Sequence, residues 1–262
     1  MAARAQLHAR SLIPLLLVVA AVVALTLIRH IRDGAPPPPR DLFPTGELRV
    51  GIDPSNPPFA VATANDLYGL DIDLARELGK RLGLPVRFVY LGYDGLYDAL
   101  KSDQVDALVA GLLIDLTRLN DVHYSQAYFN AGLLLVSDKG LSRMEDLPEH
   151  SLAYEYGSEA DAQARLWLRR ILPFSPRPYE LARYALDAVR LGESDAALVD
   201  AVTARLYLRD HADWHPALNT VTDNLYAIAT QSRRPEISVA VNQALQSMID
   251  DGTLDTILKR WL

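Results

Sequence analysis

Carboxylates follow or end apolar runs at three places in this chain. Asp53 comes directly after LRVGI, Glu155 lies near the end of SLAYEY, and Asp200 ends AALVD. If the fold brings the three together in a space without water, they raise one another's pKa unless a cation enters. The pattern favours a ligand with a cationic or strongly hydrogen-bonding group. The alternative is that Asp53 orients loop amides, Glu155 faces solvent and Asp200 caps a helix beginning at Ala201.

Other kinds of chemistry are excluded by residue type. The chain has no cysteine, which removes disulfides, thiolate catalysis, thiolate metal ligands and a lipid on an N-terminal cysteine. The six histidines do not reach metal-ligand spacing with a supporting acid. H-E-x-x-H, G-x-S-x-G and phosphate-cradling Gly-rich loops do not occur. We therefore expect no metal, no cofactor and no enzymatic activity.

Charge is distributed unevenly along the 262 residues. Residues 1–46 contain five arginines and two aspartates, a net charge of +3, whereas the remaining residues carry a net charge of −10. So negative a surface repels phosphate backbones, which argues against nucleic acid as a partner.

The elements that must position these residues alternate in type. From Glu47 onward, short β-rich runs such as LRVGI, VRFVYL, SLAYEY and AALVD are separated by helical patterns, for example Ile72, Ala75, Leu78 and Leu82. This alternation predicts an α/β fold. Residues 93–111 and 184–200 share one pattern, a helix, a polar turn and then Asp-Ala with a buried strand, which favours two similar lobes. A cleft between two such lobes can bury a small polar ligand.

The N-terminal part reads differently. Seventeen uncharged residues run from Leu12 to Ile28 with arginines on both sides, a helix about 25 Å long and near the lower limit for spanning a bilayer. Because small residues suited to signal cleavage lie inside this run, we expect residues 1–33 to be an uncleaved transmembrane anchor. Cleavage, which would give a secreted or periplasmic protein, remains the alternative. Residues 34–46, with four consecutive prolines, predict a stiff linker.

Six segments together resemble a known family. They are GELRVGIDPSNPPFA (46–60), YGLDIDLARELGKRLG (68–83), YDGLYDALKSDQVDALVAG (93–111), LTRLNDVHYSQAYFNAGLLLV (116–136), ESDAALVD (193–200) and DDGTLDTILKRWL (250–262). In order and spacing they resemble the bacterial extracellular solute-binding proteins of family 3, the polar amino-acid type. The resemblance implies a type II periplasmic-binding-protein fold with lobe 1 from 47–135 and 230–262, and lobe 2 from 136–229. It also implies a two-strand hinge, near Leu134 and Ile228, that closes the cleft.

The resemblance also implies roles for single residues. Arg118 corresponds to the arginine that clamps the ligand carboxylate, and Asp200 to the aspartate that receives its α-ammonium group. Tyr93 corresponds to an aromatic wall of the pocket, and Gly157 and Ser158 to a turn whose amides face the carboxylate. Without the family, Arg118 would read as a surface arginine, Tyr93 as simple packing and Gly157-Ser158 as an ordinary turn.

Four more residues are expected to contact the ligand: Asp53, Asn56, Gly111 and Leu113. Their residue types indicate which kind of ligand binds. Leu113, two residues after Gly111, stands where relatives often have a threonine hydroxyl. Asn56 stands where many have an aromatic residue, and Asp53 matches a position that in some receives the ligand side chain. We expect a polar or basic amino acid, such as arginine, lysine, ornithine, histidine or glutamine.

The function that the resemblance implies is the substrate-binding component of an ABC-type amino-acid transporter. Its partners would be the amino acid and membrane permease subunits, and the chain would be a monomer at the extracytoplasmic face of the membrane. Two alternatives stay open: a dehydratase of the cyclohexadienyl type on the same fold, and a sensory ligand-binding module.

Overall fold

The computed structural model describes residues 42–262. The predicted anchor within residues 1–33 and most of the linker at 34–46 lie outside the described residues. Among the helices of 42–262, none has both the length and the apolar character that crossing a membrane requires.

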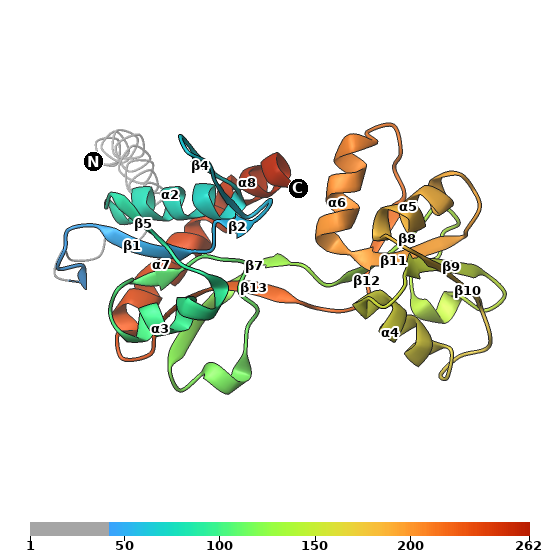
Figure 1. Cartoon of the computed structure of the whole chain (residues 1–262), viewed down its shortest axis with the longest axis horizontal. Coiled ribbons are helices and arrows are strands. Elements are labelled where there is room, and N and C mark those ends of the chain that lie inside the picture. The colour runs from blue at the N-terminus through green and yellow to red at the C-terminus, as the bar shows by residue number, and fades with distance from the viewer. Residues whose placement is uncertain (1–41) are drawn as a thin grey trace, which may run out of the picture. The chain divides into compact units, whose positions relative to one another are not determined.

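The first of two large sheets has five strands in the order β5-β1-β6-β13-β7 (Figure 1). These strands are β1 (Leu48–Ile52), β5 (Val86–Tyr90), β6 (Ala107–Leu108), β7 (Val122–Asn130) and β13 (Leu225–Gln231). β1 is parallel to β5 and β6, whereas β13 is antiparallel to β6 and β7. The helices that pack with this sheet are α2 (Leu70–Leu82), α3 (Leu96–Lys101), α7 (Pro235–Asp250) and α8 (Thr253–Trp261).

The second sheet also has five strands, in the order β10-β9-β11-β8-β12. They are β8 (Leu133–Ser137), β9 (Ser151–Glu155), β10 (Ser175–Tyr179), β11 (Ala196–Asp200) and β12 (Ala217–Thr220). β9 is parallel to both β10 and β11, and β8 is antiparallel to β11 and β12. Its helices are α4 (Glu159–Trp167), α5 (Ala182–Arg190) and α6 (Ala201–Asp210). The predicted α/β fold with two lobes is confirmed.

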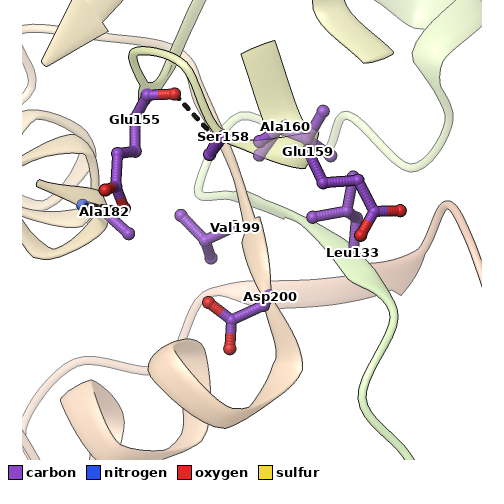
Figure 2. Close-up of a pocket in the computed structure, with 9 residues that line it drawn as sticks. Leu133, Glu155, Ser158, Glu159, Ala160, Ala182, Val199 and Asp200 are labelled. Carbon is purple, nitrogen blue, oxygen red and sulfur yellow. Dashed lines mark hydrogen bonds between the residues drawn. The ribbon is translucent and has the colours of Figure 1, made fainter. Parts of the chain in front are cut away.

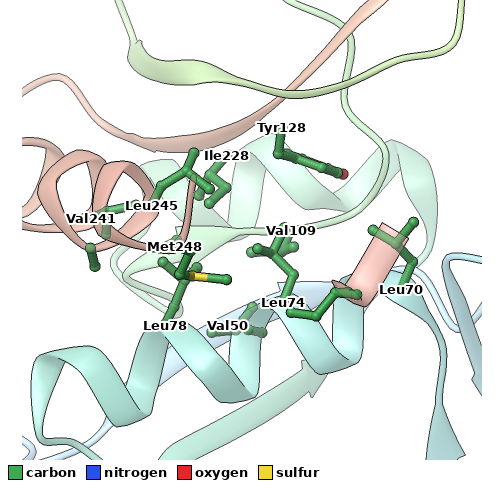
Figure 3. Packing of buried hydrophobic residues seen from close by; sticks show 14 of the residues in the cluster. Val50, Leu70, Leu74, Leu78, Val109, Tyr128, Ile228, Val241, Leu245 and Met248 are labelled. Carbon is green, nitrogen blue, oxygen red and sulfur yellow. The ribbon is translucent and has the colours of Figure 1, made fainter. Parts of the chain in front are cut away.

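Buried apolar residues on α2 and α7 form much of the first core (Figure 3). Leu74 and Leu78 of α2 lie in the same cluster as Leu245 and Met248 of α7, and these four side chains are fully buried. The spacing of four residues within α2 puts Leu74 and Leu78 on one face of the helix. The helix predicted from the apolar spacing at residues 72–82 is therefore confirmed.

The chain passes between the two sheets at residues 131–132 and again at 221–224. The two passages are bound to each other: the Ala131 amide donates to the Asn224 carbonyl at 2.9 Å, and the Asn130 side-chain oxygen accepts from the amides of Gly132 and Asn224, each at 3.0 Å. These contacts hold the two connections side by side.

The predicted hinge positions lie a few residues beyond these passages. Leu134 belongs to β8 and is paired with Val199, whereas Ile228 lies in β13 at a shift in register between Ala227 and Ala229. The lobe boundaries predicted after residues 135 and 229 fall inside the same strands. The sequence pattern located the strands, but it did not indicate at which end of each strand the chain changes sheets.

We expect the close approach at Gly132 to be necessary for stability. A β-carbon at Gly132 would overlap the carbonyl oxygen of Thr222, so Gly132→Ala should lower the free energy of unfolding by about 1–3 kcal/mol. Gly92→Ala is the matched control, because Gly92 has an ordinary φ of −74° and open space around it, and this change should leave stability unchanged or slightly raised. Urea unfolding followed by circular dichroism measures both. Equal midpoints for the two variants would contradict this reading of the passage.

Candidate ligand-binding site

A pocket of about 170 Å³ lies at the carboxyl ends of strands in the second sheet (Figure 2). Because β9, β10 and β11 are parallel, their carboxyl ends and the starts of the helices that follow them meet at one edge. Ligands of open α/β sheets bind at such edges. The residues that line the pocket are Leu133, Glu155, Ser158, Glu159, Ala160, Ala182, Leu198, Val199 and Asp200.

Asp200 serves both as a helix cap and as a pocket residue. It is the N-cap of α6, and its Oδ1 accepts a hydrogen bond from the Thr203 amide at 2.8 Å. The side chain is half-buried and lines the pocket, where its second oxygen remains available for a ligand. The two roles considered for Asp200, cap and anion, are therefore compatible.

Glu155 lies across the pocket from Asp200 and also stabilises a helix start (Figure 2). Its Oε2 accepts a hydrogen bond from the amide of Ala182, the first residue of α5, at 3.1 Å. Backbone amides at helix starts favour an ionised carboxylate. Glu155 is half-buried, so it does not simply face solvent.

The turn between β9 and α4 differs in detail from what the family resemblance implied. The Gly157 amide donates to Asp161 Oδ2 at 2.9 Å, and Gly157 is not among the residues lining the pocket. Ser158 lines it, and its hydroxyl donates to the Glu155 carbonyl at 2.7 Å. Glu159 and Ala160, the first two residues of α4, also line the pocket, and amides in the first turn of a helix have no acceptor within that helix.

A third carboxylate in the pocket comes from Glu159, which the sequence analysis missed. Glu159 Oε2 accepts from the Asn224 side chain at 3.1 Å, which connects the pocket to the second passage between the sheets. Asp53 belongs to the other sheet, where its Oδ1 accepts from the amide and the hydroxyl of Ser55 at 3.0 and 2.7 Å. These bonds fit the alternative in which Asp53 orients its own loop, and its contact with a ligand stays a prediction. A carboxylate at the first turn of a helix that follows a Gly-Ser turn was the available signal for Glu159.

Arg118 lies on the side of the first sheet, in the short 3-10 helix η3 (Leu116–Arg118). Its guanidinium carbon is 4.1 Å from the centre of the Tyr97 ring, and its Nε is 3.2 Å from Asp115 Oδ2. Arg118 thus stacks on one aromatic ring and contacts one carboxylate. Other N–H groups of its guanidinium remain available to bind a ligand. About half of the side chain is exposed (47%), so a ligand can reach it.

Asn56, Gly111 and Leu113 gather near Tyr226 of β13. A β-carbon at Gly111, whose φ is +57°, would lie 3.3 Å from the Asn56 side-chain nitrogen and 3.4 Å from the Tyr226 ring. Leu113 is 44% exposed and pairs with Tyr226 as an isolated bridge. Tyr93, in η2 (Tyr93–Gly95), is 57% exposed. These four predicted residues therefore come from one side of the site.

Tyr226 links the two groups of predicted residues, although the sequence analysis did not select it. Burial raises its pKa, and the charges of Asp200 and Asp71, together with Tyr93, raise it further. Asp200 of the second sheet therefore lies within electrostatic range of a tyrosine of the first. Within residues 42–262, no cluster of three His, Cys, Asp or Glu side chains has the geometry of a metal site.

Comparison with known proteins gives a family match over residues 48–262, to the bacterial extracellular solute-binding proteins, family 3. The arginine-binding extracellular protein of Bacillus subtilis (strain 168) is 24% identical over 82% of this chain and 86% of its own length. The lysine/arginine/ornithine-binding periplasmic protein of Escherichia coli (strain K12) is 27% identical, with 82% and 86% covered.

Among solved structures, an ancestral cationic amino acid solute-binding protein is 29% identical, with a TM-score of 0.62. The match covers 84% of this chain and 97% of that one. Because the family match includes both sheets and every residue of the pocket, the resemblance found in the sequence is confirmed. The chain belongs to family 3 of the bacterial extracellular solute-binding proteins.

Proposed function

We propose that this chain is the substrate-binding component of an ABC-type amino-acid transporter and that it captures a basic amino acid outside the cytoplasm. The observation that carries the proposal is the pocket at the edge of the second sheet, where three carboxylates meet the starts of α4, α5 and α6. Each carboxylate accepts one hydrogen bond from the protein and has further acceptor capacity for an ammonium or guanidinium group. The names of the relatives described above support the same class of ligand.

In the proposed binding mode, the α-ammonium group binds Asp200 and the α-carboxylate binds Arg118. A planar guanidinium matches a carboxylate in a bidentate geometry, which lysine cannot reproduce. The amides of Glu159 and Ala160 are further donors for the carboxylate. Closure of the two lobes about the paired passages would remove water from the ligand and strengthen these contacts.

The basic side chain is assigned to the remaining carboxylates of the pocket, Glu155 and Glu159. A ligand with a net positive charge offsets the repulsion between carboxylates in a desolvated space, whereas an apolar side chain leaves it in place. We therefore rank arginine, lysine and ornithine above histidine and glutamine, and all of these above leucine and phenylalanine.

The proposal also includes location and partners. Residues 12–28 would anchor the chain in the membrane, residues 34–46 would hold the binding domain away from it, and the monomer would deliver its ligand to permease subunits. In this proposal the chain does not transform its ligand, in contrast to the dehydratase alternative.

A thermal-shift screen of the purified chain against the twenty amino acids, ornithine and common polyamines tests the function directly. A ligand that binds only the folded state raises the melting temperature by mass action. The largest shift should come from a basic amino acid. Leucine or phenylalanine binding more tightly would refute the proposed ligand class, and turnover of prephenate or arogenate would favour the dehydratase.

Replacing Arg118 should weaken binding strongly. Truncating one partner of a desolvated charge pair costs about 2–5 kcal/mol, so Arg118→Ala should raise the Kd for arginine by about thirtyfold or more. Arg170→Ala is the matched control, because Arg170 also lies over an aromatic ring, that of Trp167, but outside the site. Calorimetry on both folded variants provides the comparison, and an unchanged Kd for Arg118→Ala would remove this residue from the site.

Asp200→Asn separates the charge of this residue from its capping role. Asparagine caps a helix about as well as aspartate, so stability should change little while the affinity for an amino acid falls at least tenfold. A ligand without the α-ammonium group should lose much less. Asp251→Asn is the control, since Asp251 also accepts from a backbone amide, that of Thr253, on the opposite lobe. Equal losses for ligands with and without the ammonium group would assign Asp200 to capping alone.

The anchor has its own test. We expect the mature protein to begin near residue 1 and to stay with the membrane fraction after salt and carbonate washing. N-terminal sequencing provides the measurement, and a mature start between residues 22 and 35 would instead describe a freely diffusing protein.

A further inference from the structure

Asp71, in the first turn of α2, is a fully buried carboxyl group with only one of its oxygens bonded. Oδ1 accepts a hydrogen bond from the Tyr128 hydroxyl at 2.8 Å, whereas Oδ2 is buried without a hydrogen-bond partner among the described residues. Burial raises the pKa of Asp71 to about 7, and the Tyr128 and Gly111 donors only partly oppose this rise. A buried carboxyl that is not fully bonded is costly for stability, so its presence calls for another explanation.

Tyr128 connects Asp71 to the predicted site. It lies in β7, is buried, and extends its ring toward the end of α2 that carries Leu70 (Figure 3). Its hydroxyl donates to Asp71 and accepts a hydrogen bond from the Gly111 amide at 3.2 Å. A continuous chain of donors therefore runs from the Gly111 N–H through the Tyr128 hydroxyl to Asp71.

Gly111 is the half-buried end of this hydrogen-bonded chain, on the side of the predicted site. It is in the left-handed region, next to Asn56 and the Tyr226 ring, among the residues expected to contact the ligand. Its amide donates to the Tyr128 oxygen and also acts on Asp71, whose pKa it lowers. The orientation of the peptide at Gly111 thus depends on where Tyr128 directs its proton.

We propose that Asp71 and Tyr128 are a buried positioning pair that fixes the peptide at Gly111 and tunes the affinity of the site for cationic ligands. This inference rests on the proposed function for the identity of the ligand. Neither residue touches the ligand in the proposal, since both are buried beneath Gly111 and Tyr226.

The protonation state of Asp71 determines how firmly Asp71 and Tyr128 hold the peptide at Gly111. When Asp71 is ionised, Tyr128 must give its proton to Asp71, and its oxygen lone pair is free for the Gly111 amide. When Asp71 is protonated, its new proton either competes for the Tyr128 oxygen or lies on Oδ2, where the described residues offer no acceptor. The ionised form therefore holds Gly111 more firmly.

The ionisable groups that act on Asp71 come from β7, at the edge of the first sheet, and from its neighbour β13. They are Tyr128 of β7, through its hydrogen bond, and Tyr226 of β13, whose pKa is raised by both Asp71 and Asp200. Asp73, two residues along α2, is occupied with Arg260 and Trp261. A cationic ligand near Tyr226 favours the ionised form of Asp71, so by linkage its binding releases protons and tightens as pH rises through about 7.

Calorimetry of the full chain with L-arginine at pH 6 and pH 8 tests this dependence. The Kd of the wild type should be about three- to tenfold lower at pH 8, and L-glutamine, which has no net charge, should respond less. Asp71→Asn cannot ionise and should show the same Kd at both pH values. Asp187→Asn is the matched control, because Asp187 also accepts a hydrogen bond from a buried tyrosine, Tyr207, outside the site. This variant should keep the wild-type ratio. If Asp71→Asn shows the same ratio of Kd values at pH 6 and pH 8 as the wild type, the proposal is overturned.

A second measurement is independent of any ligand. In the chain labelled with ¹⁵N-glycine, the Gly111 amide resonance should titrate with a midpoint near pH 7 in the wild type, and the titration should be absent in Asp71→Asn and Tyr128→Phe. A Gly111 resonance that is unaffected by pH in the wild type refutes the positioning pair even if arginine binds. Conversely, this titration in a protein that binds no amino acid would support the pair and refute the proposed function.

Discussion

The site depends on carboxylates that are also bonded to backbone amides at the starts of helices. Parallel pairing of β9, β10 and β11 places three helix starts at one edge of the second sheet, which concentrates amide donors and partial positive charge there. Asp200 and Glu155 each satisfy one of these amides. Each of these carboxylates keeps a second oxygen that is not bonded to the described residues. One arrangement thus stabilises two helices and provides the negative charge that a cationic ligand needs.

The other residues expected to contact the ligand lie on the side of the first sheet, and two short passages connect the two sheets. Only two passages join them in residues 42–262, and Asn130 bonds to both. In the proposed closure, a few backbone dihedral angles at these passages change the relation between the lobes. Glu159 extends from the pocket to Asn224 in one passage, so a ligand that attracts this carboxylate also acts on the segment that must bend.

The core of the first lobe likewise contains a carboxyl group that is connected to the site. α2 packs its apolar face against α7, yet its first turn carries a buried carboxyl that faces the site through Tyr128. An apolar residue at Asp71 would avoid the cost of burying a polar group. The carboxyl is instead retained where its charge reaches Tyr226, which also experiences the charge of Asp200. In the proposed positioning pair, core packing and ligand recognition involve the same few residues.

Much of the architecture was predictable because it depends on local patterns. The alternation of apolar runs and helical spacing predicted an α/β fold with two lobes, and the spacing at residues 72–82 predicted a helix that is present as α2. Asp200 and Ser158 were selected from the family resemblance, and the structure shows that they also cap helices α6 and α4. Six motifs in order were sufficient to identify the family.

Local sequence patterns could not predict which side chains line the pocket. Asp53 and Glu159 both follow strands in sequence, but only Glu159 reaches the pocket, because Asp53 lies on the other sheet and bonds to Ser55. Asp71 and Tyr128 are 57 residues apart, and no spacing rule connects them. The sequence by itself determined which segments form strands and helices, since those depend on neighbouring residues. Only the tertiary structure decided which side chains share a desolvated space, because burial and charge coupling depend on contacts between distant parts of the chain.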